Sequence, residues 1–114
     1  MRVSVMVLSD PRVTRAASLA LRLIRQALSQ GHRLDTAFFY HSGAYMAVNP
    51  HPEQPEWRAL ALHSGLECLV CGSALVRQGL ADHPLIDPWR RAGLGEWLAA
   101  AMRSDRILRF GGWE

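Results

Sequence analysis

The segment RVSVMVL at residues 2–8, together with LDTAFFY at residues 34–40, decides the fold class. Both are rich in β-branched and apolar residues, and Ser4 is the one polar interruption between Val3 and Leu8. Such a run is typical of a strand covered on both faces. From Ala16 to Leu28 apolar residues recur every three or four positions, which predicts an amphipathic helix. A strand–helix–strand unit of this kind makes a parallel pair of strands.

The rest of the chain continues this alternation. The first helix starts either at Asp10–Pro11, as a cap followed by a first-turn proline, or a few residues later at Thr14, and Gly31 ends it. The later patterns predict helices at 57–63, 72–78 and 94–102 and strands at 66–71 and 106–110. Segments 41–56 and 80–93 contain closely spaced prolines and are expected to be irregular. We therefore predict an α/β fold, a three-layer α/β/α sandwich on a mostly parallel sheet of four to five strands, as a single domain over residues 1–114.

Composition excludes several classes of function. The chain is 49% hydrophobic and 20% charged, as in a globular protein. All thirteen basic residues are arginine, so Schiff-base, phosphate-loop and general-base lysine chemistry is absent. The arginines are scattered and lack interleaved aromatic residues, which favours a solvated basic surface over nucleic-acid binding. No apolar run is long enough for a bilayer and no signal peptide is apparent, so we expect a cytoplasmic protein without a membrane partner.

Cys71 is the candidate catalytic residue. It ends the third predicted strand, and the carboxyl ends of parallel strands are where ligands bind in such sheets. The helix that follows would point unpaired amides at the sulfur, so we expect an exposed thiol at the lip of a crevice with a lowered pKa. Gly72 would allow close backbone approach, and the Ser73 hydroxyl would donate a hydrogen bond to a thiolate or persulfide. His41, which follows the second strand, is expected at the same edge and would stabilise the thiolate or shuttle a proton.

Cys68 and Cys71 form a C-x-x-C motif with three interpretations. A redox dithiol needs both thiols in one helical turn, whereas on a strand residues three apart lie roughly 10 Å from each other on opposite sides. A zinc site needs a second pair of ligands, which the sequence lacks. The third interpretation places Cys68 in the core and leaves Cys71 to act alone. We expect no metal and no cofactor.

Other interpretations of these residues stay open at this point. Free cysteines are often simply buried, and a histidine such as His41 often faces solvent. A flavodoxin-like nucleotide binder is a further alternative, but the loop SDPRVT at residues 9–14 lacks the glycines of a phosphate cradle. Trp113 is hard to bury in so small a monomer and suggests a subunit interface.

Three blocks resemble the DsrE/TusD family of sulfur-transfer proteins: FFYHSGAY at 38–45, LVCGSALVRQGL at 69–80 and AGLGEWLAAAMRSDRILRF at 92–110. The spacing between the blocks makes the resemblance specific, and it covers nearly the whole chain. In that family the cysteine that ends the third strand, before an alanine-rich helix ending in Arg-x-Gly, carries sulfane sulfur as a persulfide. The resemblance places this role on Cys71, with Arg77 and Gly79 at the helix end. The chain is shorter than typical members between Gly79 and Ala92, and Cys68 matches nothing in the family's motif.

The resemblance implies a cytoplasmic sulfurtransferase that takes sulfur from a donor protein and passes it to an acceptor protein. It implies a trimer or hexamer, either homomeric or with DsrF/TusC-like and DsrH/TusB-like subunits. The sulfur would serve thiolation of tRNA wobble uridine or intracellular sulfur oxidation. The alternative is a non-catalytic structural subunit of such an oligomer, with Cys71 inert.

Overall fold

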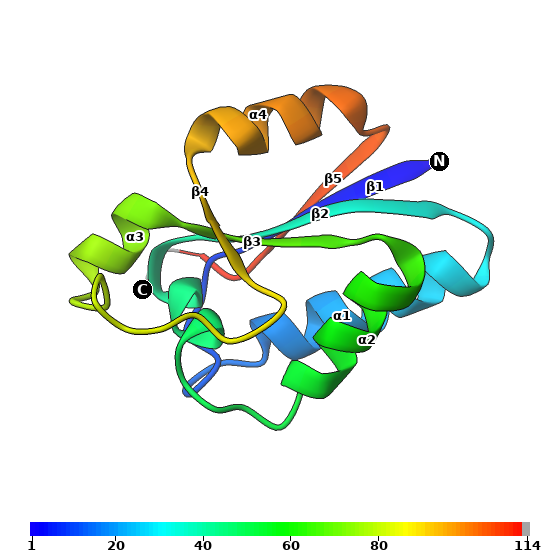
Figure 1. Cartoon of the computed structure of the whole chain (residues 1–114). Coiled ribbons are helices and arrows are strands. Elements are labelled where there is room, and N and C mark those ends of the chain that lie inside the picture. The colour runs from blue at the N-terminus through cyan, green and yellow to red at the C-terminus, as the bar shows by residue number, and fades with distance from the viewer. Residues whose placement is uncertain (113–114) are drawn as a thin grey trace.

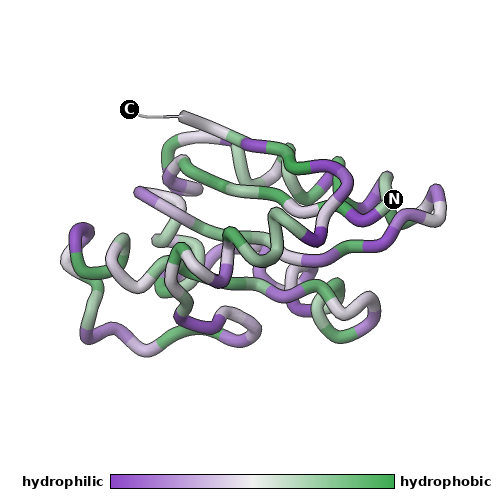
Figure 2. Tube along the Cα trace, turned by 90° about the horizontal axis from the view of Figure 1, so that it is seen from above, coloured by the Kyte–Doolittle hydropathy of each residue, from purple (hydrophilic) through white to green (hydrophobic). Residues whose placement is uncertain are grey.

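The computed structural model of the chain describes residues 1–112 and centres on one parallel sheet of five strands (Figure 1). The strands lie side by side in the order β4-β3-β2-β1-β5, and every neighbouring pair is parallel. Their bounds are β1 Arg2–Val7, β2 Arg33–Phe39, β3 Glu67–Cys71, β4 Arg90–Ala92 and β5 Arg106–Phe110. Seen from above, β5, which leads to the C-terminus, lies at one margin of the molecule (Figure 2).

Helices cover both faces of the sheet. They are α1 Ala16–Ser29, the 3₁₀ helix η1 His41–Ala47, α2 Gln54–Ser64, α3 Gly72–Arg77 and α4 Leu94–Arg103. Helices α1 and α2 lie against one face, and α4 crosses the opposite face between β4 and β5 (Figure 1). The predicted α/β/α sandwich with a parallel sheet is therefore confirmed. Trp113 lies outside the described residues. No helix among residues 1–112 is long and apolar enough to cross a bilayer.

Two segments expected to be irregular contain regular structure. The first holds η1 and the start of α2, which begins at Gln54 with Pro55 in its first turn. Proline suits this position because its fixed φ is already helical and no N–H is needed there. The second holds β4, whose three residues are too few for a strand pattern to show in the sequence. The prediction that these segments are irregular is therefore wrong, for the first because Pro55 occupies a first-turn position and for the second because β4 is so short.

Helix α1 begins at Ala16, close to the later of the two predicted starting points. Asp10 does not cap it, because its carboxylate accepts hydrogen bonds from the backbone N–H and guanidinium of Arg12. The hydroxyl of Thr14 instead accepts a hydrogen bond from the Ala16 N–H at 3.4 Å. The Ser9–Asp10–Pro11 segment is therefore a loop at the end of β1.

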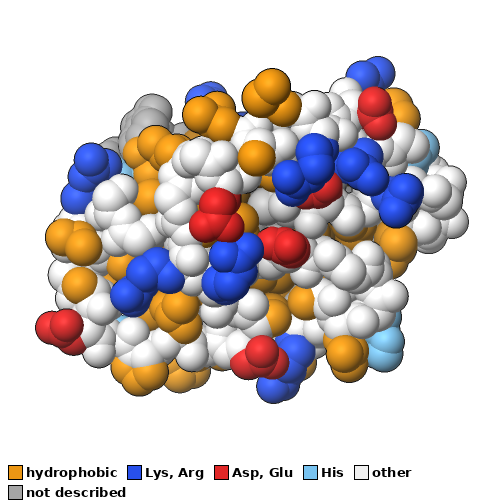
Figure 3. All heavy atoms as spheres, turned by 45° about the horizontal axis from the view of Figure 1, so that its top comes forward, with side chains coloured by type: hydrophobic (Ala, Val, Ile, Leu, Met, Phe, Trp, Pro, Cys, Tyr) orange, Lys and Arg blue, Asp and Glu red, His pale blue; other side chains and the backbone are white. Residues whose placement is uncertain are grey.

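Surface charge is mixed rather than segregated. Figure 3 shows the side of the molecule that carries α4, where basic and acidic side chains alternate over much of the surface. Arg90 pairs with Glu67 at 2.8 Å and with Glu96 at 2.9 Å, and Arg103 pairs with Asp35 at 2.8 Å. On this side of the molecule, arginines are therefore interspersed with the acidic side chains that they pair with.

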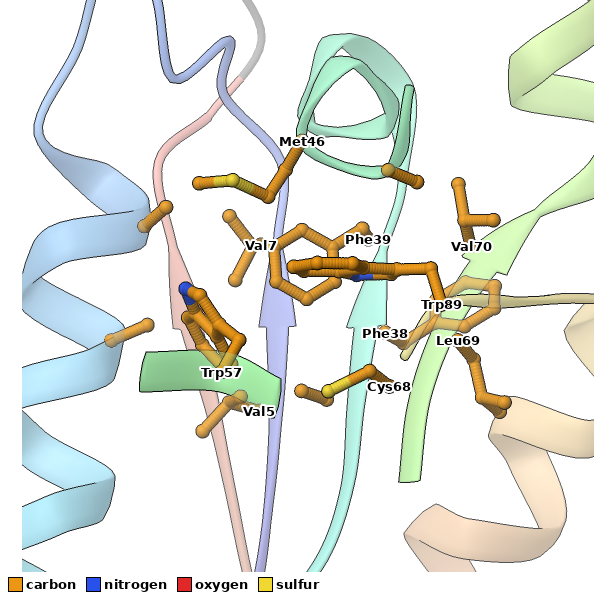
Figure 4. Packing of buried hydrophobic residues seen from close by; sticks show 14 of the residues in the cluster. Val5, Val7, Phe38, Phe39, Met46, Trp57, Cys68, Leu69, Val70 and Trp89 are labelled. Carbon is orange, nitrogen blue, oxygen red and sulfur yellow. The ribbon is translucent and has the colours of Figure 1, made fainter. Parts of the chain in front are cut away.

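Aromatic side chains connect the sheet to the helices on both faces. On the α4 face, the Phe38 ring stacks on Trp97 with ring centroids 5.5 Å apart. On the other face, the Phe39 ring makes T-shaped contacts with Trp57 and Trp89, with ring centroids 5.2 Å and 5.3 Å apart (Figure 4). Phe38 and Phe39 are adjacent in β2, so their side chains point to opposite faces. This alternation shows which face each residue of β2 and β3 occupies.

Candidate functional site around Cys71

Cys71 lies at the carboxyl edge of the sheet. It is the last residue of β3 and the residue that precedes the first turn of α3, with extended backbone at φ −68° and ψ 122°. Its strand neighbour in β4 is Ala92, and the adjacent strand β2 leads into η1. The carboxyl edge of the sheet at Cys71 is thus formed by the segments that the sequence predicts to lie there.

The register of the strands places the Cys71 side chain on the α4 face. Leu69 pairs with Phe38, whose ring contacts Trp97 of α4. Side chains two residues apart on a strand share a face, so Cys71 lies on the same side as Leu69. The Tyr40 ring, which comes directly after β2, stacks on Phe38 with ring centroids 5.9 Å apart, so Tyr40 lies on this face as well. No pattern in the sequence singled out Tyr40, because its place on the α4 face follows from ring packing that only the folded chain shows.

Cys68 points to the opposite face. It pairs with Ala37, which shares the side of Phe39 and Trp57, and it is 3% exposed (Figure 4). Burial, with a smaller contribution from the negative charge of Asp87, raises the pKa of Cys68 to about 12. Both cysteines are free. The interpretation of Cys68 as a core residue is confirmed, and the C-x-x-C spacing does not form a dithiol because the two thiols lie on opposite sides of the sheet.

The thiol of Cys71 is not exposed as predicted. The residue is 1% exposed in the described chain, and its Sγ lies 3.2 Å from the hydroxyl oxygen of Ser73. Two features cover it. The unpredicted strand β4 places Ala92 beside Cys71, and α3 starts directly after it, so that the first helical turn folds over the end of β3. Ser73 itself is exposed and Gly72 is half-buried, so the sulfur lies one side chain below the surface.

Gly72 is in close contact with a side chain that the sequence did not single out. A Cβ added to Gly72 would lie 3.3 Å from Cγ and 3.5 Å from Cδ of Arg91. Arg91 also donates a hydrogen bond to the carbonyl of Ala81 at 3.3 Å. Arg91 pairs with Val70 and therefore lies on the face opposite the Cys71 thiol. Gly72 thus lies close to the stem of Arg91, and its role beside the Cys71 thiol stays a prediction.

The segment that follows β2 is pressed against the end of β1. A Cβ on Gly43 would lie 2.4 Å from the carbonyl oxygen of Val7, so only glycine fits there without movement of the backbone. His41, half-buried with a left-handed φ of 52°, begins η1, and η1 packs against α3. His41 is therefore at the predicted edge, and its role in proton transfer stays a prediction.

A second cluster closes the edge near β1. The Arg12 guanidinium lies 2.6 Å from the Asp10 carboxylate and 3.7 Å above the centre of the Tyr45 ring. Burial alone would raise the pKa of Asp10, but the hydrogen bonds from Arg12 outweigh it, and the pKa of Asp10 is lowered. This contact joins the loop after β1 to η1. Within residues 1–112, no group of three or more His, Cys, Asp and Glu side chains is placed to hold a metal ion.

Comparison with known proteins gives two kinds of similarity. Residues 1–110 match the DsrE/DsrF-like family. The chain is 34% identical over 123 residues to a Pseudomonas aeruginosa protein named sulfurtransferase TusD homolog, covering 92% of this chain and 94% of the relative. It is 31% identical over 128 residues to sulfurtransferase TusD of an Enterobacter species, covering 96% and 100%.

Solved structures share the fold. The crystal structure of the ychN protein from E. coli aligns with a TM-score of 0.77 at 19% identity, covering 96% of this chain and all of that one. A protein of unknown function from Methanobacterium thermoautotrophicum aligns with a TM-score of 0.73 at 13% identity, covering 94% and 96%. At these identities the similarity supports the architecture alone.

Proposed function

Because the chain belongs to the DsrE/DsrF-like family, we propose that it is a sulfur-relay sulfurtransferase that carries sulfane sulfur as a persulfide on Cys71. The observation that carries the proposal is the placement of Cys71. It ends the third strand at the ligand-binding edge of a parallel sheet, with a hydroxyl group 3.2 Å from its sulfur.

The chemistry needs no cofactor. The Cys71 thiolate attacks the outer sulfur of a donor persulfide, a new S–S bond forms at Cys71, and the donor's S–S bond breaks to release the donor as a thiolate. An acceptor thiolate then attacks the outer sulfur of the Cys71 persulfide, and Cys71 leaves as a thiolate. Each step exchanges one S–S bond for another, so no external oxidant or reductant is consumed. The Ser73 hydroxyl donates a hydrogen bond to the negative sulfur.

Burial of Cys71 constrains how the transfer occurs. A donor persulfide reaches the sulfur only when the first turn of α3, which carries Ser73, moves aside, because Cys71 is 1% exposed. We place the docking of donor and acceptor proteins at the carboxyl edge, around α3 and η1, where His41 would assist proton transfer. Helix α3 is six residues long, so a small rearrangement of its first turn uncovers the Cys71 thiol.

The assembly and pathway belong to the same proposal. The chain works in the cytoplasm, in a homomeric or heteromeric trimer or hexamer with DsrF/TusC-like and DsrH/TusB-like subunits. It has no membrane partner and forms no stable complex with nucleic acid. The acceptor protein determines whether the sulfur enters tRNA thiolation or intracellular sulfur oxidation.

The burial of Cys71 also favours a second candidate function, a structural subunit in which this thiol is inert. Mass spectrometry of the intact protein separates the two functions. After incubation with inorganic polysulfide and removal of the excess, we expect wild type and Cys68→Ser to gain one sulfur atom and Cys71→Ser to gain none. Equal gain by Cys71→Ser, or no gain by wild type, would refute the carrier and leave the structural subunit.

A further inference from the structure

The segment between α3 and β4, residues 78–89, turns the chain back so that β4 runs beside β3 (Figure 1). We call it the return segment. Near its start the Leu80 N–H donates a hydrogen bond to the carbonyl of Leu75 in α3 at 2.8 Å. Further along, the Ile86 N–H donates to the carbonyl of Ala47 in η1, also at 2.8 Å. The return segment is therefore attached to both helices at this edge, and it holds β4 in a fixed place.

Arg91 of β4 reaches across the point where β3 passes into α3. A Cβ at Gly72 would lie 3.3 Å from its Cγ and 3.5 Å from its Cδ, so the stem of Arg91 runs over the first residue of α3. The guanidinium at the end of this stem donates a hydrogen bond to the carbonyl of Ala81 in the return segment at 3.3 Å. One side chain thus connects the start of α3 to the chain that follows α3.

Gly72 leaves the space that this stem occupies. Glycine weakens a helix, and Gly72 has no left-handed φ that would require it. The requirement is one of space, because a methyl group at this position would press on Cγ and Cδ of Arg91. The contact between the Gly72 backbone and the Arg91 stem is therefore the reason that the structure gives for a glycine here.

The turn that Arg91 contacts is the turn that covers the Cys71 thiol. Cys71 is 1% exposed, and its Sγ lies 3.2 Å from the hydroxyl of Ser73, the residue after Gly72. Movement of this turn away from the sulfur separates Gly72 from the Arg91 stem, because Arg91 is held in β4 and by its bond to Ala81. The contact is lost when the turn opens, so it favours the closed turn.

We propose that Arg91 is a positioning residue for Cys71: its side chain holds the first turn of α3 closed over the thiol and sets how often the sulfur becomes accessible. The stem supplies the contact with Gly72, and the guanidinium, bonded to Ala81, keeps the stem in place. The proposal rests on the proposed function, in which a donor persulfide reaches the sulfur only after this turn has moved.

The rate at which iodoacetamide alkylates Cys71 tests this role, because the reagent needs an uncovered thiol. The measured rate is the fraction of molecules with an open turn multiplied by the rate for the open thiol. Peptide mass spectrometry of the full chain measures the label on Cys71 separately from Cys68. Urea denaturation of each variant gives the free energy of unfolding, which distinguishes opening of the turn from unfolding of the whole chain.

Arg91→Ala should raise the alkylation rate about fivefold or more, because the contact that closes the turn is lost. Arg91→Lys keeps a stem and a donor at its end, and it should restore the wild-type rate to within about twofold. The matched control is Arg90→Ala in the same strand, which removes exposed ion pairs with Glu67 and Glu96. Since such pairs contribute little, the control should also stay within about twofold of wild type.

A double-mutant cycle between Gly72 and Arg91 tests the contact itself. Gly72→Ala places a methyl group against the stem and should raise the rate about threefold. This variant keeps the charge of Arg91, so a change of charge near the thiol does not explain its effect. In the Arg91→Ala background the same substitution should not raise the rate further, because the next neighbour, the carbonyl oxygen of Ala92, lies at 3.9 Å.

Four results would overturn the proposal. They are an Arg91→Ala rate within about twofold of wild type, an equal rise in Arg90→Ala, an Arg91→Lys rate as high as that of Arg91→Ala, or a rise on Gly72→Ala that does not depend on Arg91. A rise that the loss of global stability accounts for in full counts with the first of these.

Failure of this proposal is distinguishable from failure of the proposed function, because alkylation does not require sulfur transfer. If wild type gains no sulfur from polysulfide while Arg91→Ala is alkylated faster, the carrier function fails and the role of Arg91 in covering the thiol stands. If wild type gains sulfur while Arg91→Ala is alkylated at the wild-type rate, the carrier function stands and the role of Arg91 fails.

Discussion

The Sγ of Cys71 lies 3.2 Å from the Oγ of Ser73, at the junction where β3 passes into α3. Cys71 is buried and Ser73 is exposed, so this hydroxyl is in contact with the sulfur and with solvent at once. The contact makes Ser73 both the cover of the thiol and its nearest hydrogen-bond partner. Its removal should therefore affect the chemistry more than the stability.

Ser73→Ala should slow the loading of Cys71 by polysulfide about fivefold, because one hydrogen bond of about 1 kcal/mol to the reacting sulfur is lost. Its free energy of unfolding should stay within about 0.5 kcal/mol of wild type, since Ser73 is exposed. Loading is followed by intact mass against time, and Ser73→Thr, which keeps the hydroxyl, is the control. Equal rates in Ser73→Ala and wild type would remove Ser73 from the mechanism.

Gly43→Ala should lower the free energy of unfolding by about 1–3 kcal/mol, because the added Cβ would lie 2.4 Å from the backbone carbonyl oxygen of Val7. The matched control is Gly95→Ala in α4, where nothing lies within 4 Å and the change should stabilise by up to about 1 kcal/mol. Urea denaturation measures both. An unchanged midpoint for Gly43→Ala would contradict the tight seating of η1 on β1.

Cys68 should make the stability of the protein depend on alkaline pH. Its pKa is raised to about 12 from an ordinary value of 9.0, so the unfolded chain loses this proton first as the pH rises. The stability that the neutral thiol contributes is complete below pH 9 and declines above it, by about 1.4 kcal/mol for each pH unit up to the raised pKa. Urea denaturation at pH 8 and pH 10 should show a steeper loss for wild type than for Cys68→Ala. Parallel losses would show that the thiol is not held neutral.

Asp35 should make the stability of the protein depend on acidic pH. Hydrogen bonds from Arg103 lower its pKa from 3.8 against the effect of burial, with help from Thr36. The unfolded chain therefore takes up this proton first as the pH falls, and the stability present above about pH 4 is lost below it. Asp35→Asn should be about 1 kcal/mol less stable than wild type at pH 7, and the difference should shrink toward pH 2. Asp82→Asn, at an exposed position, is the control and should leave the free energy of unfolding at pH 7 within about 0.5 kcal/mol of wild type.

The patterns of β1, β2, β3, β5 and α4 were predictable from sequence because each contains enough residues for an apolar repeat to show. Strand β4 was not, because its three residues Arg90–Ala92 include two arginines. Because strand β4 was not predicted, the thiol of Cys71 was wrongly expected to be exposed. With β4 absent, β3 would be an edge strand with an accessible end, whereas the actual sheet places Ala92 against it.

The sequence by itself determined the parallel α/β architecture, the position of Cys71 at the end of β3 and the separation of Cys68 from it. These properties follow from periodicity and from the two-residue alternation of strands, which act over a few neighbouring residues. Only the tertiary structure decided that the Cys71 thiol is covered and that Arg91 packs on Gly72. Burial and surface shape depend on which distant segments pack against one another, and neighbouring residues in the chain do not specify that packing.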